Sequence, residues 1–268
     1  MKTACLQICS GADVNHNLAR VEGLLLIAAK RGCQLAALPE NFAFMHPEFE
    51  SKQRVAELDS PRILAFLSEA ARTHRLAIIG GSLLLPGRRG KLRNACPVYD
   101  RAGKCLGIYD KIHLFDVDLP DGRYQESEQI EAGETPLVVP LGEWRLGLSI
   151  CYDLRFPELY RSYAAQGCDL LSAPSAFTVP TGAAHWEILL RARAIENQAY
   201  VLAPAQIGAH PGGRRTYGHS LILDPWGKVV ARATDRDDAS GELIVADLQR
   251  QLVDEIRRKI PALTHRKM

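Results

Sequence analysis

The clearest pattern along the chain is an alternation of short apolar runs with amphipathic segments. One apolar run spans residues 3–9 and another spans residues 33–38. Between them, apolar side chains recur at intervals of four, three, four and three residues, at Val14, Leu18, Val21, Leu25 and Ala28. This spacing places them on one face of a helix, which we expect Asp13 to cap and Gly32 to end. The pattern therefore predicts a strand–helix–strand unit.

The alternation continues through the rest of the chain. We expect helices over residues 63–73, 157–167 and 185–198, and strands over residues 76–85, 144–151 and 169–174. Residues 100–103 and 224–227 begin with Asp and end with Gly, which suits type I turns between paired strands. We expect loops over residues 46–60 and 116–128, and we expect both loops to border the ligand pocket. Strands alternating with helices, with hairpins added, indicate the α/β class with a mixed sheet.

Composition then excludes several classes of protein. The chain has 268 residues, of which 47% are hydrophobic and 24% are charged, and this excludes a disordered chain. The formal net charge of +2 argues against a dedicated nucleic-acid binder. Because no linker, repeat or low-complexity segment divides the sequence, we expect one domain over residues 1–268, with residues from about 249 to 268 as a C-terminal arm.

Cysteine usage and hydropathy bear on the compartment. No apolar run approaches the ~18 residues that a membrane-spanning helix needs. The first residues turn polar at Ser10, which is unlike a secretory signal. Seven cysteines, an odd number without regular spacing, indicate reduced thiols rather than a disulfide framework. We therefore expect a cytoplasmic protein with no membrane partner.

Three reactive side chains lie at or near the ends of apolar strands. These are Glu40, Lys111 and Cys151. Strand ends in α/β proteins converge on clefts, so an acid, an amine and a thiol could meet there. A carboxylate could accept the proton of a thiol, and an ammonium could stabilise the oxyanion of a tetrahedral intermediate. The trio would suit acyl transfer through a thioester.

Each of these signals is weak when taken alone. Cys151 could be a small buried hydrophobe, Glu40 a solvated loop acid and Lys111 a surface residue. No HExxH, CxxC, Walker-type or GxSxG motif competes with them. The segment 212–215, Gly-Gly-Arg-Arg, reads as a flexible loop rather than a phosphate cradle.

Together, however, the segments around these residues resemble the nitrilase superfamily of carbon–nitrogen hydrolases. The segments that carry the resemblance are Leu38-Pro-Glu-Asn41, Tyr109-Asp-Lys-Ile-His-Leu-Phe-Asp116, Tyr124-Gln-Glu-Ser127 and Ser149-Ile-Cys-Tyr-Asp-Leu-Arg-Phe-Pro-Glu158. They follow the family's order, and the similarity extends from about residue 3 to residue 247.

The resemblance implies a four-layer α-β-β-α sandwich that pairs as a homodimer and needs no metal and no organic cofactor. It implies Cys151 as the nucleophile and Glu40 as the general base. Lys111 would stabilise the tetrahedral intermediate, and Glu126 would position Lys111 or the substrate. The backbone N–H of Tyr152 would complete the oxyanion hole.

Three segments are similar to the Nit branch of the superfamily, namely the segment that follows Cys151, residues 176–198 and residues 217–227. That branch implies an amidase for a small molecule, namely deaminated glutathione, which is hydrolysed to 2-oxoglutarate and cysteinylglycine as metabolite repair. Because such a substrate carries a 2-oxo acid carboxylate, we choose Arg155 as its bidentate partner, with a salt bridge to Glu158 or to an acid elsewhere as the alternative. Phe177 and Thr181 could line the acyl pocket.

Three other interpretations compete with this one. An ω-amidase would hydrolyse 2-oxoglutaramate and release ammonia. An inactive binding module would show a damaged triad, and a membrane-linked acyltransferase would need membrane segments, so the sequence favours neither. Residues His185 and Trp186 fit packing or a dimer face better than catalysis, whereas Tyr217 and His219 fit either a pocket or a strand.

Overall fold

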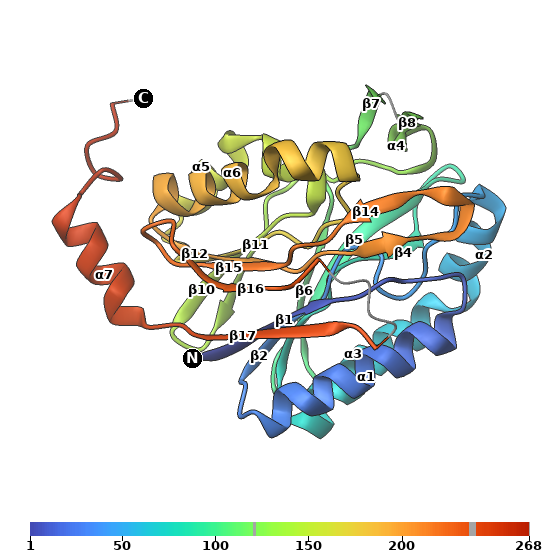
Figure 1. The fold of residues 1–268 in the computed structure, drawn as a ribbon, viewed down its shortest axis with the longest axis horizontal. Helices are drawn as coiled ribbons and strands as arrows, with labels where there is room; N and C mark the ends of the chain where they lie inside the picture. The colour runs from blue at the N-terminus through green and yellow to red at the C-terminus, as the bar shows by residue number, and fades with distance from the viewer. Residues whose placement is uncertain (120–121, 236–239, 268) are drawn as a thin grey trace.

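The computed structural model describes residues 1–119, 122–235 and 240–267. Two sheets pack face to face, and helices cover the outer face of each sheet (Figure 1). This is the predicted four-layer α-β-β-α sandwich of the α/β class.

Seven strands form the first sheet. They are β1 (Lys2–Gln7), β2 (Leu35–Ala37), β3 (Ala77–Ile79), β4 (Leu83–Pro86), β5 (Leu92–Tyr99), β6 (Cys105–Asp110) and β17 (Glu242–Asp247). Their spatial order is β17-β1-β2-β3-β5-β4, with β6 also paired to β5. Strand β2 is parallel to β1 and β3, and the remaining pairs are antiparallel.

Six strands form the second sheet, in the order β16-β15-β12-β11-β10-β9. They are β9 (Val138–Leu141), β10 (Trp144–Leu148), β11 (Leu170–Ser172), β12 (Tyr200–Ala203), β15 (Leu221–Leu223) and β16 (Val229–Arg232). Two separate hairpins join β7 (Asp116–Leu119) to β8 (Gly122–Gln125) and β13 (Ile207–Ala209) to β14 (Arg215–Tyr217).

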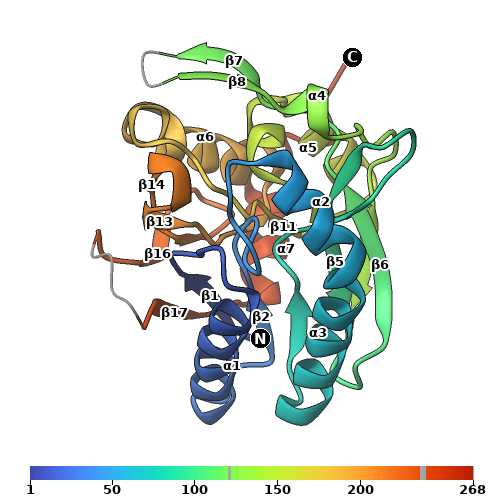
Figure 2. The ribbon, with the colours of Figure 1, turned by 90° about the vertical axis from the view of Figure 1, so that its right-hand side faces the viewer.

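Helices complete the outer layers. They are α1 (Val14–Lys30), α2 (Phe49–Leu58), α3 (Ser60–His74), α4 (Glu126–Gln129), α5 (Pro157–Ala165), α6 (Val179–Asn197) and α7 (Arg250–Lys259). The first sheet is covered by α1 and α3, which lie side by side in Figure 2, and the second sheet is covered by α5 and α6. The Asp13 carboxylate accepts a hydrogen bond from the His16 amide, which confirms the predicted cap of α1.

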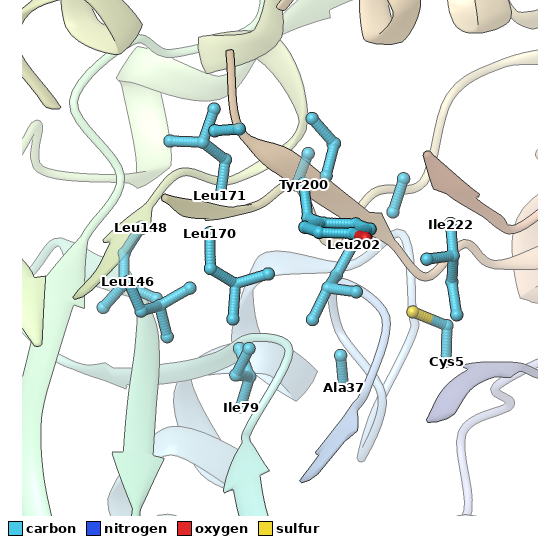
Figure 3. Packing of buried hydrophobic residues seen from close by; sticks show 14 of the residues in the cluster. Cys5, Ala37, Ile79, Leu146, Leu148, Leu170, Leu171, Tyr200, Leu202 and Ile222 are labelled. Carbon is cyan, nitrogen blue, oxygen red and sulfur yellow. The ribbon is translucent and has the colours of Figure 1, made fainter. Parts of the chain in front are cut away.

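The main core lies between the two sheets. Leu170 and Leu202 of the second sheet point toward Ala37 and Ile79 of the first sheet, whereas Leu171 points to the opposite side (Figure 3). This alternation follows from the period of two residues along a strand. A second core packs α1 and α3 against the first sheet. Burial on both faces explains why these strands read as continuous apolar runs.

The structure differs from the sequence predictions in four places. The segment predicted as a loop over residues 46–60 contains α2, and the other predicted loop contains β7, β8 and α4. Helix α6 begins at Val179 instead of residue 185, because Pro180 in its first turn is compatible with a helix start. The strand predicted over residues 76–85 is divided into β3 and β4 at Gly80 and Gly81.

Helix α7 follows the last strand and lies at one end of the molecule, near the C-terminus (Figure 1). Arg257 of this helix donates a hydrogen bond to the carbonyl of Cys168 at 2.6 Å, and Val253 is fully buried. The division into one domain with an arm from about residue 249 stays a prediction, and residue 268 lies outside the described residues. Across the described chain, no helix is both long and apolar enough to cross a membrane.

Candidate active site

Glu40 lies three residues beyond the end of β2, on a turn held close to the first sheet. A Cβ atom on Gly81 would lie 2.1 Å from the Pro39 carbonyl oxygen, and Gly81 has φ = +58°. Only glycine fits such a position without strain. Gln206 donates a hydrogen bond to the Glu40 carbonyl at 2.9 Å and so fixes the backbone from the other side. The Glu40 side chain is 4% exposed.

Lys111 directly follows β6, and its ammonium lies between two carboxylates. Its Nζ is 3.1 Å from Oε1 of Glu40 and 2.8 Å from Oε2 of Glu126. Asn94 of β5 donates a hydrogen bond to Oε1 of Glu40 at 3.0 Å, and the Phe115 amide donates to Oε2 of Glu126 at 2.7 Å. Each carboxylate therefore has a second donor that fixes its orientation toward Lys111.

This buried cation is stabilised by the two acids. Burial acts to lower the pKa of Lys111, but the charges of Glu126 and Glu40 outweigh it, so the pKa of the ammonium lies well above its usual value. Lys111 is therefore charged at every pH at which the protein is expected to work. It can provide a fixed positive charge in a site with little water.

Cys151 opens a short 3-10 helix (Cys151–Arg155) after β10, in the second sheet. Its φ is +49°, an uncommon conformation for a residue with a side chain. The Cys151 amide donates to the Pro174 carbonyl at 2.9 Å, which holds this turn against the end of β11. Strained backbone of this kind persists where the surrounding structure determines it, and such positions cluster at active sites.

Asp153 connects the Cys151 turn to the segment that carries Lys111. Its buried carboxylate accepts hydrogen bonds from the amides of Ile150 at 2.8 Å and His113 at 2.9 Å, and from the Tyr109 hydroxyl at 2.8 Å. The residues on either side of Lys111 are thus joined through one carboxylate to the residue before Cys151. This connection fixes the position of the amine relative to the thiol.

The surroundings of Cys151 favour the neutral thiol over the thiolate. Burial, followed by the charge of Glu40, raises the pKa of Cys151 far above its ordinary value, against the opposing effect of Lys111. Glu40 is close enough to act on the thiol and lines the same cavity. Its carboxylate can therefore accept the proton of the sulfur when the sulfur attacks an electrophile. The structure brings together Glu40, Lys111, Glu126 and Cys151, and their catalytic roles stay predictions.

These four residues line a cavity of about 380 Å³. Its lining includes five cationic side chains, Lys52, Lys111, Arg123, Arg155 and Arg214, against two carboxylates, Glu40 and Glu126. The excess of positive charge in the lining exceeds the formal charge of +2 for the whole chain. Because a concentration of one sign of charge attracts ligands of the other, the cavity favours an anionic ligand.

The four residues predicted to bind substrate also line this cavity. The Arg155 guanidinium lies over the rings of Phe177 at 5.3 Å and Tyr152 at 5.8 Å. Its Nη1 is 3.3 Å from Nδ1 of His185, and it makes no salt bridge to Glu158. Thr181 lies in the first turn of α6. The structure thus places Tyr152, Arg155, Phe177 and Thr181 beside Cys151, although their roles stay predictions.

Sequence reasoning missed several residues of the lining. Asn94 looked like an ordinary strand residue, and Lys52 lies on a helix that was not predicted. Arg214 belongs to the segment interpreted as a flexible loop, but its Nη2 donates to the Ala176 carbonyl at 2.7 Å beside the site. The only sequence feature that marked Arg214 was the pair of arginines after two glycines in residues 212–215.

Trp186, which the sequence favoured for packing, and Tyr217 and His219, which it left between a pocket and a strand, make packing contacts outside the cavity lining. Trp186 is buried against Phe177, and its indole N–H donates to the His219 carbonyl at 2.8 Å. Tyr217 stacks on His219 with centroids 4.1 Å apart, and neither lines the cavity. Among residues 1–119, 122–235 and 240–267, no group of three or more His, Cys, Asp or Glu side chains is arranged to hold a metal ion.

Comparison with known proteins was made at the level of sequence and of structure. The family model for carbon–nitrogen hydrolases matches residues 2–258. A deaminated glutathione amidase of Synechocystis is 41% identical, over 98% of this chain and 97% of the relative. The omega-amidase NIT2 of Bos taurus is 36% identical, over 99% of this chain and 95% of the relative.

Solved structures give the same result. The crystal structure of Saccharomyces cerevisiae Nit3, described as a member of branch 10 of the nitrilase superfamily, has a TM-score of 0.87 and 29% sequence identity. The match covers 100% of this chain and 97% of that chain.

Proposed function

Because the chain belongs to the carbon–nitrogen hydrolase family, and is therefore a hydrolase of amide bonds, we propose that it hydrolyses deaminated glutathione to 2-oxoglutarate and cysteinylglycine. The observation that carries the proposal is that Cys151, Glu40 and Lys111 line one cavity, with the Lys111 ammonium 3.1 Å from the Glu40 carboxylate. The amidases among the relatives support the reaction class, and the positive cavity supports an anionic substrate.

The first half of the reaction forms a thioester. The Cys151 sulfur attacks the amide carbonyl carbon while its proton passes to Glu40. The carbonyl oxygen becomes an oxyanion, which the Lys111 ammonium and the Tyr152 amide stabilise. That amide is available because the first N–H groups of a helix have no partner within the helix. Protonated Glu40 then gives its proton to the leaving nitrogen, the carbon–nitrogen bond breaks, and cysteinylglycine departs.

The second half hydrolyses the thioester. Glu40, again a carboxylate, removes a proton from a water molecule as the water oxygen attacks the thioester carbon. The same donors stabilise the second oxyanion. When the carbon–sulfur bond breaks, the proton held by Glu40 returns to sulfur, and 2-oxoglutarate is released. Glu126 keeps Lys111 in place throughout, and Asn94 orients Glu40.

The alternative function is an ω-amidase that hydrolyses 2-oxoglutaramate to 2-oxoglutarate and ammonia, which the Bos taurus relative supports. The two substrates share the acyl group and differ only in the leaving group. We expect kcat/KM to be at least ~100-fold higher for deaminated glutathione when both are assayed side by side for release of 2-oxoglutarate. A reversed preference would assign the ω-amidase function instead.

Arg155 is expected to bind the carboxylate of the 2-oxo acid. We expect Arg155→Lys to raise KM about 10-fold or more for both substrates with a smaller change in kcat, because lysine lacks the bidentate guanidinium. Steady-state kinetics on both substrates would measure the effect, with Arg54→Lys on the exposed side of α2 as the control. An unchanged KM would place the carboxylate elsewhere.

We also propose that two copies pair through α6, as the resemblance implies. Ile188 is 69% exposed and Ile195 is 54% exposed, and they lie seven residues apart on one face of this helix. Trp226, which is 59% exposed, follows the strand β15 that α6 covers. We expect Ile188→Glu to convert a dimer into monomers in sedimentation equilibrium. A wild-type monomer would contradict the proposal.

The cytoplasmic location and the role in metabolite repair are further parts of this proposal. The location is supported by the odd number of cysteines, which fits a reducing compartment. The repair role is supported by the chemistry of the substrate, since deaminated glutathione is a side product of transaminases that hydrolysis returns to useful metabolites.

A further inference from the structure

Three cations in the cavity lining, Lys52, Arg123 and Arg214, take no part in the mechanism described above, and two of them are considered as a pair. Lys52 lies on α2, and Arg214 lies between the 3-10 turn Pro211–Gly213 and β14. Both line the cavity that holds Cys151 and Glu126. Within the described ranges neither side chain forms an ion pair, and their hydrogen bonds go to the neutral oxygens of Gln129 and Ala176.

These two cations are also close enough to act on each other. Burial, followed by the charge of Arg214, lowers the pKa of Lys52, while Glu126 opposes the shift. Glu126 is already engaged by Lys111 and by the Phe115 amide. In addition, Nε of Arg214 is buried and has no hydrogen-bond acceptor. Two like charges and an unsatisfied donor held together in a cavity are unfavourable unless an anion completes the site.

A series of aromatic contacts in the cavity lining connects Arg214 to Arg155. Three rings of the cavity lining, here called the aromatic row, contact one another in series, with centroids of Tyr152 and Phe115 5.2 Å apart and those of Phe115 and Tyr124 5.1 Å apart. Arg155 lies 5.8 Å from the Tyr152 ring, and Arg214 lies 5.6 Å from the Tyr124 ring. Positive charge is thus present at both ends of one aromatic row.

We propose that Lys52 and Arg214 form the subsite for the free C-terminal carboxylate of a peptide leaving group. This inference rests on the proposed function, in which Arg155 holds the carboxylate of the acyl group. A dipeptide extends about 7 Å beyond the scissile amide, which can carry its carboxylate along the aromatic row toward Arg214. The site would therefore select amides whose amine is a short peptide with a free carboxyl terminus.

The decisive test removes the carboxylate from the substrate and the cations from the enzyme. Deaminated glutathione is compared with its C-terminal glycinamide, for wild type, Lys52→Met and the double variant Lys52→Met/Arg214→Gln. We expect wild type to prefer the carboxylate about 30-fold in kcat/KM, a typical value for charge-assisted hydrogen bonds, and the double variant to lose most of this preference. Arg54→Met and Arg215→Gln, which are exposed neighbours in the sequence, should keep the wild-type ratio.

An equal ratio in wild type and the double variant would overturn the subsite while leaving the proposed function intact. If wild type releases no 2-oxoglutarate, the proposed function fails instead, and calorimetric binding of both ligands to Cys151→Ala then decides the subsite. The subsite is supported if Cys151→Ala binds the carboxylate ligand more tightly than the glycinamide, and if adding Lys52→Met abolishes this difference in affinity. Equal binding of both ligands, or binding of neither, would refute it.

Discussion

Cys151→Ala is expected to abolish turnover and leave the fold unchanged. Alanine has no nucleophile, so the thioester cannot form, and a loss of about 10⁵-fold in kcat corresponds to about 7 kcal/mol of transition-state stabilisation. Alanine keeps the same φ preference as cysteine and fills most of the same space, so the backbone turn should persist. Release of 2-oxoglutarate measures the rate, and thermal unfolding measures the stability.

The matched control for this variant is Cys168→Ala. Cys168 is also a buried free cysteine of the inter-sheet core, and it does not line the cavity. We expect this control to retain activity within a few-fold and to show the small loss of stability that follows removal of a buried sulfur. Comparable activity in Cys151→Ala and Cys168→Ala would refute Cys151 as the nucleophile.

Lys111→Met is expected to damage both stability and rate. The change leaves the buried Glu40 carboxylate and the partly buried Glu126 carboxylate without their cation, and removing one partner from a buried ion pair typically costs about 3–5 kcal/mol. It also removes a donor for the oxyanion, for which a loss of at least ~10²-fold in kcat is typical. Denaturant unfolding and steady-state kinetics would measure the two effects.

The double variant Lys111→Met/Glu126→Gln separates these effects. Replacing one of the two carboxylates removes their repulsion, so stability should recover in part, whereas activity should not. Recovery of activity together with stability would show that Lys111 only supports the fold. If Lys111→Met lowered the free energy of unfolding by less than about 1 kcal/mol, the ion pairs of Lys111 would contribute no more than an exposed pair does. That result would contradict the expected effect of burial in this cluster.

The fold was predictable where one strong periodicity dominated a segment. The stripe of α1 and the buried strand β2 are of this kind, and so is the start of α5 at Pro157. Helix α2 was missed because it buries only Ala56 fully, so there is no apolar stripe to find. Its position depends on packing against β4, which lies far along the sequence.

The site was predictable to the extent that its residues lie in contiguous motifs. Glu40, Lys111 and Cys151 each follow a strand, and the surrounding segments resemble a known family. Asn94 could not be found in this way, because its role depends on the pairing of β5 with β6, which places it beside Lys111. Arg214 reaches the cavity through a long side chain, and a sequence does not reveal the direction of such a side chain.

The origin of the reacting groups in two different sheets has a mechanical consequence. Glu40 and Lys111, the proposed base and cation, follow strands of the first sheet, and Cys151, the proposed nucleophile, follows a strand of the second. The distance between the Cys151 sulfur and the Glu40 carboxylate is therefore set by the packing of apolar side chains between the two sheets. Since catalytic groups tolerate displacements of only about 0.5 Å, side chains such as Leu148 and Leu170 act as spacers for the chemistry. Sliding of one sheet over the other would therefore lower the catalytic rate before it unfolded the protein.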